Sequence, residues 1–314
     1  MRIATTIADF HCYPLTSAET VRCYEGTGFR HLDYSFYRAT RPGGELVADD
    51  WMRYVIDAGK EAERLGFDFV QAHSPSNNFM KETEEFDHVV ALNVRAIEAC
   101  GYLGIPNIVV HSGYSDNSRY PADMADFHAQ NRRFYEAMLD AAEKNNVTVC
   151  TENFCTTRED GTCAFLTAQD IMDFLNYCGD PQYLAACWDT GHGNLQGIDV
   201  YEQLMTLGGS LKTIHVQDNM GKRDDHIAPF TGTLDLDGLM CGLIDSGFVD
   251  RGGVFTFEAG NIIQSGHSWP NYRHLNDSRP QKLASPSPEL KRKAIALLYE
   301  MGCEMLRAYD IPIE

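Results

Sequence analysis

The sequence lacks the features that mark membrane-spanning, secreted or dinucleotide-binding chains. No apolar run approaches the ~18 residues that a transmembrane helix needs, and the first ten residues include Arg2 and Asp9 instead of the apolar core of a signal peptide. The ten cysteines form no CxxC pair and no disulfide framework. No GxGxxG segment follows the first apolar run, so a dinucleotide site gains no support. We therefore expect a cytoplasmic protein with reduced cysteines.

Basic residues are scarce as well. The chain has 26 Lys and Arg against 45 Asp and Glu, which gives a net charge of −19. Such a chain repels the phosphates of nucleic acids and of anionic membranes. We expect a small-molecule, sugar-like substrate, with no nucleic-acid or membrane partner. We also expect a homo-oligomer, with a hetero-oligomer as the alternative.

Eight short apolar runs alternate with longer amphipathic stretches. Several of these runs are apolar throughout, which is typical of parallel strands buried on both faces. The alternation favours a closed (β/α)8 TIM barrel, an α/β fold, over an open sheet, and we predict one domain over residues 1–314. The runs are residues 3–7, 31–36, 67–72, 107–110, 147–151, 184–188, 211–216 and 254–257, and the clearest helical stretches are 84–103, 123–145, 168–177 and 288–309.

A polar residue ends seven of the eight runs. One acid in such a place is usually a helix cap, and one histidine is usually a packed core residue. The active sites of barrels lie at the carboxyl ends of the strands, however, so all seven would converge, and their carboxylates would repel one another without a cation. Three carboxylates and one imidazole suit a hard divalent cation. The seven residues are Asp33, His73, His111, Glu152, Asp189, His215 and Glu258.

Four motifs near these positions resemble one known family, the xylose-isomerase-like barrels. The motifs are Thr151-Glu152-Asn153, Trp188-Asp189-Thr190-Gly191-His192, Ile214-His215-Val216-Gln217-Asp218-Asn219 and Phe257-Glu258-Ala259-Gly260. The family includes sugar isomerases and epimerases, inosose dehydratases and endonuclease IV, and the resemblance covers essentially the whole chain. It implies that Glu152, Asp189, His215 and Glu258 are metal ligands. It also implies that His192 contacts a substrate oxygen.

The endonuclease branch of that family uses more ligands, and its pattern can also be laid on this chain. It would add His73, His111 and His192, together with Asp224 and His226, so Asp224 and His226 are candidates for further metal or substrate ligands. After His226 the family often has a Pro-Gly-Glu-Gly turn, whereas this chain reads Ala-Pro-Phe-Thr-Gly over residues 228–232. We expect the substrate to be bound by His111, His73, Asp218 and Asp33.

The resemblance implies isomerase or epimerase chemistry on a sugar or polyol ketone. Glu152 and Glu258 would transfer the α-proton on opposite faces of a metal-stabilised enediolate, with His192 bonded to the carbonyl oxygen. We expect Mn²⁺, with Mg²⁺, Co²⁺ or Zn²⁺ as alternatives. A second hypothesis is a lyase, either a dehydratase or an enzyme that cleaves a 3-keto-glycoside. The others are an abasic-site endonuclease, against which the acidity counts, and a non-catalytic sugar-binding barrel.

A long segment, residues 261–287, follows the eighth run and holds His267, Trp269, Tyr272 and His274. It exceeds an ordinary loop of a barrel. It is either a lid or substrate wall, or a surface excursion or subunit contact. Elsewhere, Trp188 should face the helices because Asp189 faces inward and side chains alternate along a strand. We expect no chemical role for His11, His31, His88 and His128.

Overall fold

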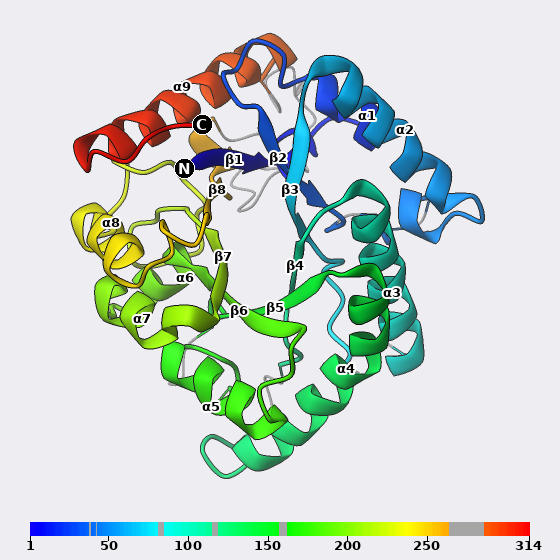
Figure 1. Ribbon diagram of the computed structural model, residues 1–314, viewed down its shortest axis with the longest axis vertical. Helices are drawn as coiled ribbons and strands as arrows, with labels where there is room; N and C mark the ends of the chain where they lie inside the picture. Colours follow the sequence, from blue (N-terminus) through cyan, green and yellow to red (C-terminus); the bar gives the residue numbers. More distant parts are fainter. Residues whose placement is uncertain (38, 42, 81–84, 115–118, 157–161, 264–285) are drawn as a thin grey trace, which may run out of the picture.

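The computed structural model describes residues 1–37, 39–41, 43–80, 85–114, 119–156, 162–263 and 286–314. Eight parallel strands form one sheet in the order β7-β6-β5-β4-β3-β2-β1-β8, so neighbours in the sheet follow one another along the chain (Figure 1). The strands are β1 (Arg2–Thr6), β2 (His31–Ser35), β3 (Asp68–His73), β4 (Asn107–Val110), β5 (Thr148–Glu152), β6 (Leu184–Asp189), β7 (Leu211–His215) and β8 (Val254–Phe257).

The sheet closes between β7 and β8. Val216, the residue after β7, forms a parallel bridge with Phe257. Its amide donates to the Thr256 carbonyl at 2.8 Å, and the Glu258 amide donates to the Val216 carbonyl at 3.1 Å. The chain therefore folds as a (β/α)8 barrel, as the sequence predicts. Closure also fixes the backbone of Glu258 beside the end of β7.

Helices surround the barrel (Figure 1). The helices are α1 (Ser17–Arg22), α2 (Trp51–Leu65), α3 (Phe86–Leu103), α4 (Met124–Asn145), α5 (Ala168–Cys178), α6 (Thr190–Leu195), α7 (Val200–Leu207), α8 (Leu236–Asp245) and α9 (Pro288–Ala308). Short 3₁₀ turns join them, of which η1 (Ile7–Phe10) and η5 (Gly260–Ile262) border the site.

Local sequence signals set the ends of these helices. Thr167 and Asp170 form a capping box at the start of α5, in which each side chain binds the other residue's amide. The α2 helix ends at Gly66, whose φ of 73° is left-handed and favours glycine. The observed bounds differ from the predicted ones by at most two residues.

The core has two parts. Side chains between the strands and the helices form the main core, which includes the fully buried Trp188, so this residue faces the helices as expected. A small separate cluster of Val109, Cys150, Ala185 and Cys187 fills the barrel interior. All ten cysteines are reduced thiols.

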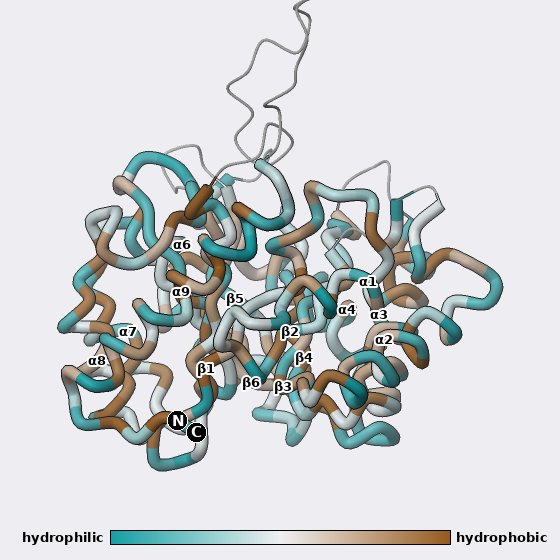
Figure 2. Tube along the Cα trace, turned by 90° about the horizontal axis from the view of Figure 1, so that it is seen from above, coloured by the Kyte–Doolittle hydropathy of each residue, from teal (hydrophilic) through white to brown (hydrophobic). Residues whose placement is uncertain are grey.

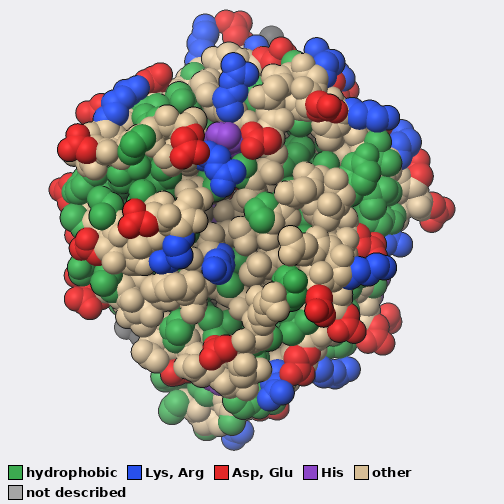
Figure 3. Space-filling model, viewed as in Figure 1, with side chains coloured by type: hydrophobic (Ala, Val, Ile, Leu, Met, Phe, Trp, Pro, Cys, Tyr) green, Lys and Arg blue, Asp and Glu red, His purple; other side chains and the backbone are tan. Residues whose placement is uncertain are grey.

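Both chain ends lie at the amino-terminal end of the barrel (Figure 2). The Met1 amino group donates to the Pro312 carbonyl and lies 3.4 Å from Glu314 Oε1. On this face, Lys and Arg side chains are interspersed with Asp and Glu (Figure 3). The strand ends that carry the candidate site open on the opposite face.

Two expectations from the sequence concern the long segment after β8 and the absence of a membrane-spanning helix. Of the segment 261–287, the structure describes only 261–263 and 286–287, so His267, Trp269, Tyr272 and His274 lie outside the described residues. Within the described residues, no helix has the length and apolar character needed to cross a membrane.

Candidate active site

Four side chains from the ends of neighbouring strands form one compact cluster. Glu152, Asp189 and His215 end β5, β6 and β7, and Glu258 follows β8. One nitrogen or oxygen from each lies within 4.8 Å of the others. Glu152, Asp189 and His215 are at most 2% exposed. The barrel register thus brings together the four residues that the sequence resemblance proposes as metal ligands.

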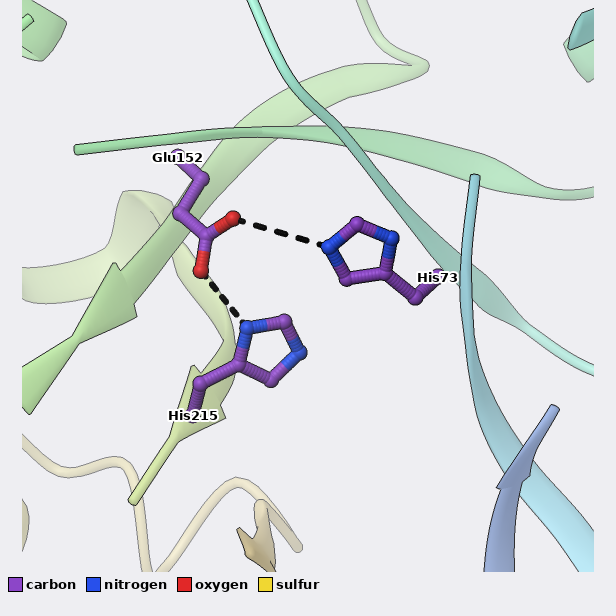
Figure 4. Close-up of side chains that lie close together, drawn as sticks. All are labelled: His73, Glu152 and His215. Atoms are coloured by element: carbon purple, nitrogen blue, oxygen red, sulfur yellow. Dashed lines mark hydrogen bonds and ion pairs between the residues drawn. The ribbon is translucent and has the colours of Figure 1, made fainter. Parts of the chain in front are cut away.

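The imidazole of His215 joins the two glutamates. Its Nδ1 lies 2.6 Å from Glu152 Oε1 and 3.4 Å from Glu258 Oε2. Figure 4 shows Glu152 directing one oxygen at His215 and the other towards His73, whose Nε2 is 3.9 Å away. The Nε2 atom of His111 is closer, at 2.8 Å from Glu152 Oε2. Imidazoles therefore surround the Glu152 carboxylate.

The surroundings give the two glutamates different proton affinities. Burial alone would raise the pKa of Glu152, but the imidazoles of His215 and His111 hold it well below its ordinary value. Burial raises the pKa of Glu258 to about 7, although His215 and His226 lower it. The Glu152 carboxylate therefore holds a proton less tightly than the Glu258 carboxylate does, a difference that is typical of acid and base pairs.

The cluster fits a divalent cation. Asp189 Oδ1 accepts from the His192 amide at 2.7 Å and from Gln217 Nε2 at 3.2 Å. Its other oxygen, Oδ2, is buried and has no hydrogen-bond partner among the described residues. A buried carboxylate oxygen without a partner is costly unless a cation or proton occupies its lone pairs. Three carboxylates and an imidazole are the donor set that hard or borderline divalent ions prefer.

A second group of titratable side chains adjoins the first. Asp224 Oδ2 lies 2.9 Å from His226 Nε2 and 3.5 Å from His192 Nε2. Carbonyl oxygens orient both rings, because His192 Nδ1 binds Asn153 O and His226 Nδ1 binds Glu258 O. Cys155, His192 and Asp224 also offer ligand atoms within 4.8 Å of one another.

Both groups border a cavity of about 430 Å³, a size typical of small-molecule sites. Its lining includes aromatic side chains from three loops, Tyr37, Tyr114 and Phe154. Of the residues that the sequence singled out, those that line the cavity are His73, His111, His192, Asp224, His226 and Glu258. Glu152 lies behind His111, below the cavity surface.

Two predicted substrate contacts lie elsewhere. The Asp218 carboxylate accepts from the amides of Asn219, Gly232 and Leu234 at 2.8–3.0 Å, so it is used to hold the loop after β7. A β-carbon at position 232 would overlap this carboxylate, which explains the glycine there. Asp33 is 1% exposed and lies beneath the mouth; burial raises its pKa. Neither Asp218 nor Asp33 lines the cavity in the part of the chain that is described.

Sequence reasoning missed several residues of the site. Gln217 bridges the two groups by donating to Asp189 Oδ1 at 3.2 Å and to Asp224 Oδ1 at 2.7 Å. A β-carbon at Gly191 would overlap the Gln217 amide, so this glycine provides space for Gln217. Cys155 lies three residues after Glu152, but a single cysteine in sequence gives no signal.

Three further histidine or charged residues line the cavity beyond the expected set. His11, for which we expected no chemical role, is one of them. Asp9 and Lys291 are the others, and they come from opposite ends of the chain. No short motif links those two positions, which is why the sequence did not indicate them.

Comparison with solved structures supports the fold. A D-tagatose 3-epimerase-like protein matches with a TM-score of 0.70 and 16% identity over 98% of this chain and 100% of that one. The E. coli 3-keto-D-glucoside 4-epimerase matches with a TM-score of 0.65 and 15% identity, over 96% of this chain and 99% of that one. The IOLI protein, whose structure contains a bound zinc atom, matches with a TM-score of 0.70 and 14% identity, over 98% of this chain and 99% of that one. At these identities the likeness shows a shared fold.

Sequence comparison adds two matches. An uncharacterised protein of Sinorhizobium fredii (strain NBRC 101917 / NGR234) is 28% identical over 152 residues, 48% of this chain and 47% of that protein. The chain thus aligns with about half the length of this curated relative. Residues 26–271 match the family described as xylose isomerase-like TIM barrel. This match spans most of the barrel, from before β2 to beyond β8, and the chain therefore belongs to the xylose isomerase-like TIM barrel family.

Proposed function

We propose that this protein is a metal-dependent isomerase or epimerase of a sugar or polyol ketone. The observation that supports the proposal most is the convergence of two carboxylates, Glu152 and Glu258, on His215 Nδ1. Glu258 itself and His111, which lies against Glu152, line the small-molecule cavity. Two groups that can each carry a proton beside one substrate carbon suit removal of a proton and its return. Structures of sugar epimerases share the fold.

The positions of the side chains suggest a division of roles. Glu258 lines the cavity, so we assign to it one of the two proton transfers. Glu152 is covered by His111, and its Oε2 lies 2.8 Å from His111 Nε2. We therefore assign the second transfer to this pair, with His111 facing the substrate. His192 has its Nδ1 held by the Asn153 carbonyl, and we assign to its Nε2, which lies 3.5 Å from Asp224 Oδ2 at the cavity, the hydrogen bond to a substrate carbonyl oxygen.

We propose that Glu152, Asp189, His215 and Glu258 hold the metal. When bound, the ion supplies positive charge that stabilises the anion formed on the substrate oxygens. Mn²⁺ is our first choice, with Mg²⁺, Co²⁺ or Zn²⁺ as alternatives, because oxygen-rich mixed sites discriminate poorly among these ions. The zinc in the IOLI protein is consistent with a metal site in this fold. The reduced cysteines agree with a cytoplasmic location.

A lyase is the second candidate, and one observation favours it. Asp224 lies between two imidazoles, His192 and His226, and all three line the cavity. Such a group can store a proton and donate it to a leaving oxygen, which a dehydratase or a glycoside-cleaving lyase needs and an epimerase does not. An abasic-site endonuclease is disfavoured by the net charge of −19.

Product analysis in deuterated water tests the proposal. The protein is incubated with ketoses, inososes and 3-keto-glycosides, and each product is examined by mass spectrometry and by NMR. We expect one deuterium at an inverted or isomerised carbon and an otherwise unchanged mass. Loss of water or of an aglycone would instead establish the lyase, and no exchange with any member of the panel would contradict both.

Matched variants assign the activity to the site. Glu258→Gln should lower the exchange rate by roughly 10²-fold or more, the usual effect of removing a general base. His111→Asn should slow inversion more than exchange, because Glu258 can still remove and return the proton on its own side. Glu304→Gln, on the exposed surface of α9, is the control and should behave like the wild type. Equal loss in the control variant would show that the effect is not specific to the site.

A further inference from the structure

Two buried, oppositely charged side chains line the cavity and have no part in the chemistry proposed above. Asp9 lies in η1, directly after β1, and Lys291 lies in the first turn of α9. They are 7% and 4% exposed, and both line the cavity. Charged groups are rarely buried to this extent unless they are paired or used.

Their hydrogen bonds leave donors and an acceptor unused. Asp9 Oδ2 accepts from Thr5 Oγ1 at 2.7 Å and from the Tyr24 hydroxyl at 3.4 Å. Asp9 Oδ1 is buried and has no hydrogen-bond partner among the described residues. The Lys291 ammonium donates to the Gly260 carbonyl, and an ammonium has three protons to donate. Within the described residues, the pair therefore offers one carboxylate oxygen and two N–H groups to a ligand.

The pair adjoins the candidate proton-transfer residue. A β-carbon at Gly260 would overlap Asp9 Oδ1, so the glycine allows the carboxylate to approach the turn that follows β8. Glu258 lies two residues before Gly260 in this turn and lines the same cavity. A ligand whose reacting carbon is beside Glu258 would therefore extend its neighbouring substituents towards Asp9 and Lys291.

The charges argue against an anionic substituent. Lys291 is the one Lys or Arg among the described residues that line the cavity, and its neighbour Asp9 is an acid. The other acids of the lining, Asp224 and Glu258, lie beside histidines instead. The start of α9 offers few donors to an anion: Pro288 has no amide hydrogen, and the Leu290 amide donates to the Ser287 side chain. A phosphate needs several donors and would be repelled by Asp9. A hydroxyl both donates and accepts, so it suits this pair.

We propose that Asp9 and Lys291 form a hydroxyl-binding subsite that selects an uncharged polyhydroxy substrate over a phosphorylated one. The inference rests on the proposed function, because it names the substrate class of the same site. Lys291 donates to one hydroxyl oxygen of the substrate, and Asp9 Oδ1 accepts from the same or the neighbouring hydroxyl. Burial fixes both groups before the substrate arrives, so the contacts cost little ordering.

Binding and kinetics of Lys291→Met, Asp9→Asn and a control, Lys293→Met, test the subsite. Lys293 lies on the same helix with its side chain exposed, paired to Glu289. The probes are D-fructose, D-tagatose and D-fructose 6-phosphate. Lys291→Met should raise KM for the neutral ketoses roughly 10-fold or more and change kcat little, as expected for a lost charged hydrogen bond outside the reacting centre. Lys293→Met should match the wild type.

Asp9→Asn distinguishes direct recognition from a structural role. It should weaken binding of D-fructose and strengthen binding of D-fructose 6-phosphate, because the repulsion of the phosphate is removed. A general structural loss would weaken both. An unchanged KM in Lys291→Met, or tighter binding of D-fructose 6-phosphate than of D-fructose by the wild type, would overturn the proposal.

A readout that needs no turnover separates this inference from the proposed function. Each ligand is added to the protein and the shift in Tm is measured. If no ketose exchanges its proton, the epimerase proposal fails, yet a Tm shift by D-fructose or D-tagatose that is lost in Lys291→Met still supports the subsite. Absence of any shift of the wild-type protein by either neutral sugar would overturn the subsite.

Discussion

Replacing Asp9 with Asn should increase the free energy of unfolding relative to the wild type, and this gain should become larger as the pH rises. Burial raises the pKa of Asp9 from its ordinary value of 3.8 to about 6, although Lys291 and the Thr5 hydroxyl lower it. The folded protein therefore holds this proton more tightly than the unfolded chain does. Between these two pKa values the folded state binds more protons, so stability falls with rising pH and levels off above about 6. Asp9→Asn has no carboxylate at this position, so its stability does not fall with rising pH for this reason.

The pKa values set the magnitude of the effect. The difference between 3.8 and about 6 corresponds to a penalty of about 3 kcal/mol once the carboxylate is ionised in both states. Proton linkage reduces this penalty to about 1.6 kcal/mol at pH 5 and leaves it near 3 kcal/mol at pH 8. The free energy of unfolding of Asp9→Asn, relative to the wild type, should therefore increase by roughly 1.4 kcal/mol over this range.

Urea unfolding at pH 5, 6, 7 and 8, with a chelator present throughout, measures this difference. Asp123→Asn is the control, because hydrogen bonds from Arg119 lower the pKa of the partly exposed Asp123 below 3.8. This carboxylate is ionised in both states across the whole range, so the control difference should stay constant. A constant difference for Asp9→Asn as well, or one that falls with pH, would refute the reasoning about the buried carboxylate.

Two further substitutions test how the site is held. Gly191→Ala should displace the Gln217 amide and weaken metal binding to Asp189 by roughly 10- to 100-fold, the usual effect of losing a supporting hydrogen bond. Competition with a chromophoric chelator measures this, with Gly209→Ala, where a β-carbon meets open space, as the control; equal affinities would count against the bridging role. Asp218→Ala should lower the free energy of unfolding by roughly 3 kcal/mol because three amides lose a charged acceptor. Thermal or urea unfolding that differs little from the wild type would show that the loop does not depend on Asp218.

The barrel and the cluster at its mouth could be predicted because they follow from short-range rules. Parallel strands alternate their side chains and meet at one edge, so a polar residue that ends an apolar run, such as Glu152 or His215, has a defined position. Trp188, one position before an inward-facing acid, must then face the helices. The period of a strand and the order of the strands are sufficient to place these side chains.

Other parts of the site depend on distances that no local pattern encodes. Asp218 follows β7 in a motif, but three loop amides determine where its carboxylate points. Asp9 and Lys291 meet only because the first strand and the last helix are neighbours in the closed barrel. Gln217 looks like an ordinary polar residue in the sequence, and only the structure shows that its side-chain amide donates to two acids, Asp189 and Asp224.

Metal content measures the central claim most directly. The protein is purified without added metal and reloaded with Mn²⁺, and bound metal per chain is determined after desalting for the wild type, His215→Asn and His88→Asn. His88 is exposed on α3 and serves as the control. We expect at least one tightly held ion in the wild type and in His88→Asn, with loss of that ion and of solvent proton exchange in His215→Asn. Equal metal content in all three proteins would contradict the assignment of Glu152, Asp189, His215 and Glu258 as the metal site.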